Sequence, residues 1–148
     1  MASHPFREVH AMRIAHLLLP AASLLLLAAC ATTRMDDPQK LALYQGHAGA
    51  PVKSIRYVDP IGWERIDNFH LVLNVRPRES WLVAMTGPCL DWGSGDQAIS
   101  ISHNGGMVNP GLDSVNFPRS RISCRIGEIR LVDPVAVRDA RNALAATP

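Results

Sequence analysis

The sequence predicts a mainly β domain, a small antiparallel sandwich or barrel of seven to nine short strands, with a short helix at each end. From Val52 onward, apolar residues recur with a period of two, which is typical of strands with one buried face. Turn residues separate these runs at short, even intervals, as they do in small sandwiches and barrels. Two Asp-Pro pairs, which begin at Asp37 and Asp133, flank the strand region and resemble helix starts.

The first helix is expected to begin at Asp37, which would act as the N-cap and is followed by a proline. Leu41 and Tyr44 lie about one turn apart and give this helix an apolar face, and Gly46 is a fair stop signal. The small residues 49–51 are expected to break the chain before the first strand.

Two neighbouring runs are the most apolar part of the predicted sheet. An alternating run from Phe69 to Val75 places four apolar side chains on one face, and Val72 lies on the opposite face. Residues 81–85 answer it after a polar turn. Because strands that are buried on both faces read as nearly continuous apolar runs, these two runs predict a central hairpin.

The other predicted strands are short. They cover residues 55–57, 63–66, 97–102, 107–108, 112–117, 122–126 and 128–132. The pair Asn104-Gly105 predicts a hairpin turn because both positions tolerate positive φ, and Gly127 is a candidate bulge. Residues 87–93 are too few for a full helix and are expected to form one turn. A second helix is expected after Asp133.

Residues 12–30 read as a bacterial export signal. Its last four residues, Leu27-Ala28-Ala29-Cys30, resemble the lipobox of bacterial lipoproteins, and this resemblance implies that a lipid is attached to Cys30. Arg13 supplies the positive charge, leucines supply the apolar run, and small residues precede Cys30. A membrane-spanning helix is the alternative, but it needs about 20 apolar residues, and this run is shorter and is interrupted by Pro20. The residues before Met12 do not resemble the start of such a signal, so translation is expected to begin at Met12.

These features divide the chain into four parts. They are an export signal (residues 1–29), a lipidated cysteine with a tether and a short helix (residues 30–50), a β-rich domain with one disulfide (residues 51–133), and a C-terminal helix and tail (residues 134–148). Removal of the signal takes two basic and one acidic side chain from totals of 15 and 13, which leaves a net charge of +1. Nucleic-acid binding needs a clustered basic face, so no nucleic-acid partner is predicted.

The cysteine count is three, and the predicted lipid occupies Cys30. Cys89 and Cys124 remain as an even pair in an exported domain, where disulfides persist. A disulfide that closes this loop would stabilise the fold by about 3–4 kcal/mol on the chain-entropy estimate. A reactive thiol or a metal site is the alternative, although neither cysteine has the Cys-x-x-Cys or Cys-x-x-His spacing of such sites.

Several short motifs occur in a characteristic order along residues 44–133. The most specific is Cys124-Arg125-Ile126 with Ile129, preceded by Cys89-Leu90. The others are Pro51-Val52, Trp63, Trp81-Leu82 and Asp113-Ser114-Val115. This order resembles a group of small proteobacterial lipoproteins that is known only as a domain of unknown function, in which tyrosine is commoner than Trp81. The resemblance implies a periplasm-facing lipid anchor and a bonded cysteine pair, and it carries no catalytic residues.

His70, His103 and Asp113 are the candidate metal or acid–base residues. His70 lies on a predicted strand, His103 lies beside a turn, and the carboxylate of Asp113 is suited to bond the local backbone. The histidines lack the close spacing that marks a zinc site, so no metal, cofactor or catalytic residue is predicted. A small hydrolase or metal-dependent envelope enzyme built on these three residues is the alternative.

Aromatic and basic residues offer two further alternatives. Trp63, Trp81 and Trp92 would suit a sugar-stacking platform, but in a domain poor in aromatic residues they are expected to fill the core. Loop arginines would suit lipid phosphates, but solvated surface positions are favoured. These arginines are Arg76, Arg78, Arg119, Arg121 and Arg125.

The sequence therefore favours a lipoprotein of the cell envelope over an enzyme. We expect a non-enzymatic, membrane-tethered binding or structural module that faces the periplasm, with an envelope protein or ligand as its partner. An aspartate after the lipidated cysteine retains lipoproteins of enteric bacteria in the inner membrane, so Ala31 favours the outer membrane. An inhibitor or chaperone of an envelope protein is the remaining alternative.

Overall fold

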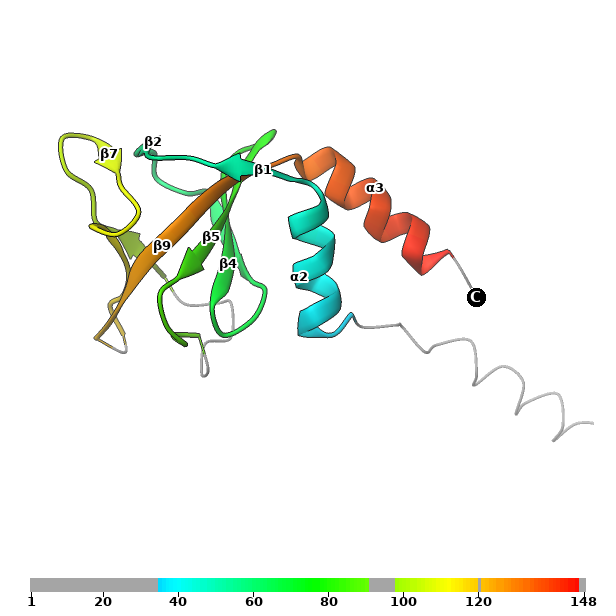
Figure 1. The fold of residues 1–148 in the computed structure, drawn as a ribbon, viewed down its shortest axis with the longest axis horizontal. Helices are drawn as coiled ribbons and strands as arrows, with labels where there is room; N and C mark the ends of the chain where they lie inside the picture. The colour runs from blue at the N-terminus through cyan, green and yellow to red at the C-terminus, as the bar shows by residue number, and fades with distance from the viewer. Residues whose placement is uncertain (1–34, 91–97, 120, 147–148) are drawn as a thin grey trace, which may run out of the picture. The chain divides into compact units, whose positions relative to one another are not determined.

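A curled antiparallel sheet that forms a half-barrel is the body of the protein in our computed structural model (Figure 1). The structure describes residues 35–90, 98–119 and 121–146. Strands make up 42% of it, and a short helix lies at each end of the strand region. The predicted fold class is therefore confirmed.

The elements follow one another in short steps. In chain order they are α2 (Asp37–Gly46), β1 (Ala48–Pro51), β2 (Ile55–Arg56), β3 (Gly62–Arg65), β4 (His70–Arg76), β5 (Glu79–Met85), β6 (Ser100–Ile101), β7 (Met107–Val108), β8 (Ser114–Phe117), β9 (Ile122–Val132) and α3 (Pro134–Ala145). The main sheet has the order β3-β4-β5-β9-β8-β6, and β1 also pairs with β9. β2 and β7 form a separate two-stranded sheet. Because β3 and β6 end the main path, the half-barrel is open between them.

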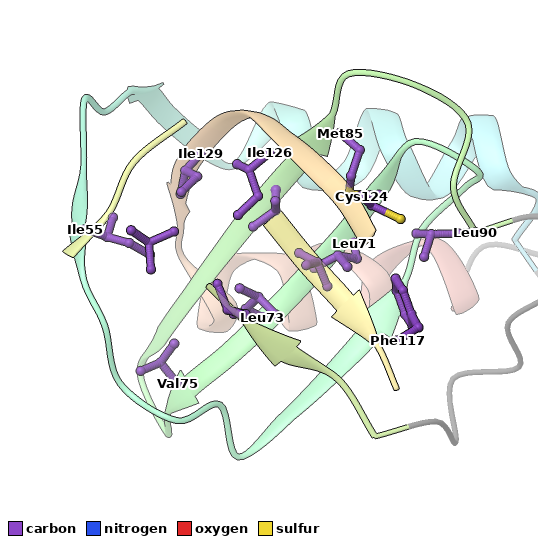
Figure 2. Close-up of a cluster of buried hydrophobic side chains, with 14 residues drawn as sticks. Ile55, Leu71, Leu73, Val75, Met85, Leu90, Phe117, Cys124, Ile126 and Ile129 are labelled. Carbon is purple, nitrogen blue, oxygen red and sulfur yellow. The ribbon is translucent and has the colours of Figure 1, made fainter. Parts of the chain in front are cut away.

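β4 and β5 form the central hairpin that the sequence predicts, since β3 and β9 pair with their outer edges. One face of the hairpin points into the half-barrel, where Leu71 and Leu73 join the main core (Figure 2). On the other face, Val72 and Leu82 pack in a second core beneath the two helices. Burial on both faces explains why these two strands are nearly continuous apolar runs.

α2 and α3 lie side by side on the outer face of the sheet (Figure 1). Asp36 caps α2: its carboxylate accepts from the amide of Gln39 at 2.8 Å, and the Gln39 side chain accepts from the amide of Asp36. The predicted cap, Asp37, is wrong by one residue because two aspartates precede the proline. The predicted cap of α3, Asp133, is confirmed by its bonds to the next two free amides. Neither helix is long and apolar enough to cross a bilayer, and the described residues contain no other candidate.

β4 begins one residue later than the sequence predicts. Phe69 lies outside β4, and 43% of its surface is exposed. The carboxylate of Asp67 accepts hydrogen bonds from the amides of Phe69 and His70, both at 2.7 Å. This tight turn interrupts the alternation before the strand begins, so Phe69 does not share the buried face.

Three local features of the sheet can be compared with the sequence predictions: strand β1, the turn before β7 and the bulge in β9. β1 was not predicted, because its small residues carry no apolar alternation and pair with β9 through the backbone. The turn before β7 is centred on Gly105 and Gly106, with φ of 59° and 77°, one residue later than predicted. The bulge at Gly127 is confirmed, since Ala84 and Met85 pair with the residues on either side of it.

One buried hydroxyl links both helices to the sheet. Tyr44 on α2 donates to a carboxylate oxygen of Glu64 on β3 at 2.7 Å and accepts from Arg141 on α3 at 3.0 Å. Lys40 also pairs with Glu64 at 3.7 Å. Burial, together with the hydrogen bond to Glu64, raises the pKa of Tyr44 to about 12.

The stability of the protein should therefore fall at alkaline pH. The folded pKa of Tyr44 lies above its ordinary value of 10.0, so this phenol stabilises the fold below pH 10, and the contribution is lost as the pH rises toward 12. The free energy of unfolding in urea, measured between pH 9 and 11.5, should decline less steeply in Tyr44→Phe than in the wild type. Tyr57→Phe is the control and should keep most of the decline. Equal slopes in Tyr44→Phe and the wild type would contradict this account.

Candidate functional site

A disulfide joins Cys89, in the loop after β5, to Cys124 on β9, with their Cα atoms 6.0 Å apart. The predicted pair is thus confirmed. Cys124 is only 2% exposed, so the bond lies within the main core. The predicted lipidation residue, Cys30, lies outside the described residues.

Arg65 holds the same loop against the sheet and α2. Its guanidinium donates to the carbonyl oxygen of Leu90 at 3.1 Å and to the carboxylate of Asp37 at 2.9 Å. It also donates to the side chain of Asn68 at 2.6 Å, and Asn68 accepts from the amide of Cys89 through its carbonyl. The disulfide and Arg65 therefore fix the position of residues 89–90 from two sides.

A shallow groove of about 320 Å³ lies on the open side of the half-barrel, where β3 and β6 end the sheet. Its walls come from residues far apart in the sequence, the segment before β3 and the segment that leads into β6. The lining residues are Tyr57, Asp59, Pro60, Gly62, Trp63, Ala98, Ile99 and Ser100. We call this feature the seam groove.

Both aromatic rings of the seam groove are held by neighbouring rings. The Tyr57 ring stacks on His103, with the ring centres 4.1 Å apart, and Trp63 meets Phe117 edge to face at 5.8 Å. The hydroxyl of Tyr57 donates to the carboxylate of Asp59, which raises the pKa of Tyr57. The seam groove thus combines two fixed aromatic rings with one carboxylate.

A second groove, of about 700 Å³, lies where β1, the end of β9 and the start of α3 meet the tip of the β4–β5 hairpin. It is lined by His47, Gly49, Arg78, Leu131, Val132, Asp133, Pro134 and Val135. Leu131 and Val135 are 46% and 40% exposed. The carboxylate of Asp133 in this lining is occupied as the cap of α3. The basic side chains among the described lining residues are Arg78 and His47.

The structure gives each of the candidate metal or acid–base residues a local partner. The His70 ring bonds the carboxylate of Asp67 at 2.8 Å, and His103 stacks on Tyr57. Asp113 accepts from the hydroxyl of Ser102 at 3.0 Å and from a nearby backbone amide. Within the described part of the chain, no three His, Cys, Asp or Glu side chains gather as a metal site requires. In the described residues these three side chains do not form a metal cluster, although His103 lies near enough to Asp113 to help lower the pKa of that carboxyl.

Asp113 instead joins β6 to the turn before β8. Its burial opposes ionisation, but hydrogen bonds from the amide of Asn109, at 2.7 Å, and from Ser102 outweigh it, and the pKa of Asp113 is lowered. The Ser102 hydroxyl also accepts from the amide of Ser114 at 2.8 Å. The carboxylate therefore satisfies buried donors and has a structural role.

The described tryptophans are partly buried against the main core, and the arginines that were considered as lipid-phosphate ligands lie at the surface. Trp81 is half-buried against the main core, and its ring nitrogen donates to Glu79 at 3.1 Å. Trp63 packs against the same core and also lines the seam groove, whereas Trp92 lies outside the described residues. Of the loop arginines, Arg76 pairs with Glu79, Arg125 donates to the carbonyl of Gly111, and the others are exposed.

Sequence reasoning alone did not find the seam groove. Tyr57, Asp59 and Pro60 read as an ordinary strand end and turn, and nothing local in the sequence connects them to Ile99. The groove arises because the sheet does not close between its two end strands, β3 and β6, and no local pattern in the sequence indicates this.

Comparison with known proteins gave one match. A model of a family described as a family of unknown function (DUF6491) matches residues 12–148. No curated protein and no solved structure matches the chain.

Loss of the disulfide should cost much of the stability of this small domain. The bond closes a loop between residues 35 positions apart, so replacing both cysteines by alanine should lower the free energy of unfolding by about 3–4 kcal/mol. Urea denaturation monitored by circular dichroism measures the loss. Wild-type protein in excess dithiothreitol is the control and should lose a similar amount, and an unchanged midpoint on reduction would refute the estimate.

Replacement of Asp113 should weaken the fold and change its response to acid. Asp113→Asn leaves the buried donors around it poorly matched, which should cost about 1–3 kcal/mol at neutral pH. Since the folded pKa of Asp113 is lowered, the stability it contributes is present above the ordinary pKa and is lost as the pH falls through the folded value. As the pH is lowered from 7 to 3, the melting temperature of Asp113→Asn should fall less steeply than that of the exposed control Asp139→Asn. Parallel curves would exclude this role.

Proposed function

The chain belongs to the DUF6491 family of unknown function, and we propose that it is a lipid-anchored protein of the bacterial cell envelope that binds a partner and does not catalyse a reaction. The anchor in this proposal is Cys30, at the end of the export signal. The domain would face the periplasm, and Ala31 favours the outer membrane as its location. The family match begins at residue 12, where the export signal is expected to start.

The observation that carries this proposal is the Cys89–Cys124 disulfide. Disulfides persist in exported proteins and are rare in the reducing cytosol. Once these two cysteines are paired, Cys30 is the one cysteine of the sequence that is left for a lipid. The pairing and the export signal therefore support the same compartment from independent parts of the chain.

The position of α2 supports a domain that stays near the bilayer. α2 begins at Asp37, seven residues after Cys30. A fully extended chain spans at most about 3.5 Å per residue, so the folded domain would begin within roughly 25 Å of the anchored sulfur. Several acyl chains, as bacterial lipoproteins carry, would make this attachment lasting, because one chain alone binds a membrane only weakly.

A binding role is favoured over catalysis by the partners of the polar residues. Asp113 is committed to backbone and hydroxyl donors, and His70 is committed to Asp67. The seam groove, by contrast, combines aromatic rings with a carboxylate at an open edge of the sheet. Ligand sites are commonly concave and mostly apolar, with a few placed polar groups, and the seam groove has this character.

Cys30→Ser tests the anchor. In a Gram-negative host, we expect the wild type to fractionate with membranes and to begin at an acylated Cys30, as seen by intact-mass analysis. Cys30→Ser should lose the acyl mass and the processed, membrane-bound form. Ala31→Ser is the matched control and should behave as the wild type.

Two results would overturn the anchor. One is a mature wild-type species with no acyl mass on its first residue. The other is a Cys30→Ser protein that is still processed and membrane-bound. A third variant, Ala31→Asp, tests the location, because it should move the protein from the outer to the inner membrane of an enteric host.

A further inference from the structure

We infer that the seam groove is a carbohydrate-binding site that receives a pyranose ring bearing hydroxyl or amino groups. The inference rests on the binding role proposed above and specifies the ligand class. It depends on the geometry of the groove between β3 and β6 and on the charge of its lining.

The aromatic rings of the seam groove suit the apolar face of a sugar ring. Tyr57 and Trp63 both line the groove, where each presents the part of its ring that the main core leaves uncovered. A pyranose has the matching character, with a C–H face and a rim of polar groups. His103 and Phe117 already hold the two rings in place, so little conformational freedom is lost when a ligand packs on them.

The polar groups at the rim define which sugars fit. Asp59 is the one acidic side chain in the lining, and the described lining residues include no lysine, arginine or histidine. Its carboxylate is exposed and accepts from the Tyr57 hydroxyl, which leaves acceptor capacity for hydroxyl or ammonium groups of a ligand. Like charges across an interface are costly, so sugars that carry carboxylate or phosphate are disfavoured.

The size of the seam groove limits the ligand to a small unit. A volume of about 320 Å³ lies at the lower end of the range for small-molecule sites, roughly 300–1,000 Å³. The groove opens to the surface beside Ile61, which is 70% exposed. An open groove of this size accommodates one ring of a longer chain that continues beyond its rim.

Ligand-observed saturation-transfer NMR on the detergent-solubilised full chain tests this inference without relying on tryptophan fluorescence. The probes are a neutral glucose oligomer, a glucosamine oligomer, an oligomer of galacturonic acid and a proline-rich peptide. We expect saturable binding of the first two probes, tighter for the glucosamine oligomer, and none of the other two.

Matched variants locate the binding. Trp63→Leu should weaken binding of both sugars at least tenfold, whereas Trp81→Leu, which alters a tryptophan outside the groove, should change it less than twofold. Asp59→Asn should weaken binding of the glucosamine oligomer more than that of the glucose oligomer, and Asp139→Asn should change neither. If Trp63→Leu fails to fold, Tyr57→Leu replaces it, because Tyr57 also lines the groove and belongs to no regular strand.

Four results would overturn the inference. They are no binding of either neutral or amino sugar, preferred binding of the galacturonic acid oligomer, binding of the peptide in place of the sugars, and equal loss in Trp63→Leu and Trp81→Leu. An acylated, membrane-bound chain that binds no sugar would refute this inference and leave the anchor intact. A sugar-binding chain without acyl mass would refute the anchor and leave this inference intact.

Discussion

The central β4–β5 hairpin carries apolar side chains on both faces, and the rest of the domain is arranged to bury them. On one face, the sheet curls so that β8 and β9 bring Val115, Ile126 and Ile129 over Leu71 and Leu73. On the other face, α2 and α3 cover Val72 and Leu82. A sheet with two apolar faces needs a layer on each side, so both terminal helices are structural requirements of the hairpin.

The same curvature explains why the domain has an open edge. The main sheet path ends at β3 and β6, each of which is four residues long or shorter, and no ladder joins them in the described residues. The disulfide and Arg65 hold residues 89–90 near one end of this opening. The domain thus gains a groove from the incomplete closure of the half-barrel. The groove is lined by the start of β3, by β6 and by the chain segments that lead into these two strands.

Much of the fold was predictable because its main signal is local. Period-two alternation identifies β4, β5 and the two halves of β9, which were predicted as separate strands, and Asp133 identifies the start of α3. One error arises where two neighbouring residues compete: Asp36, and not Asp37, caps α2. The other arises where side chains carry no signal, because the small residues of β1 pair with β9 through the backbone. The candidate site was not predictable. The topology of the sheet brings residues 57–63 and 98–100 together at the seam groove, and the spacing of these residues along the chain does not predict this.

The contact between Tyr44 and Arg141 has a consequence for the order in which the domain folds. These residues are 97 positions apart, and Tyr44 packs in the second core together with Val137 of α3. A chain that is synthesised from its N-terminus delivers α2 first, but α2 has no complete binding surface until α3 arrives. Since contacts between distant residues slow folding, the earliest helix to emerge is expected to dock last, and the nascent domain depends on its final helix to become resistant to proteases.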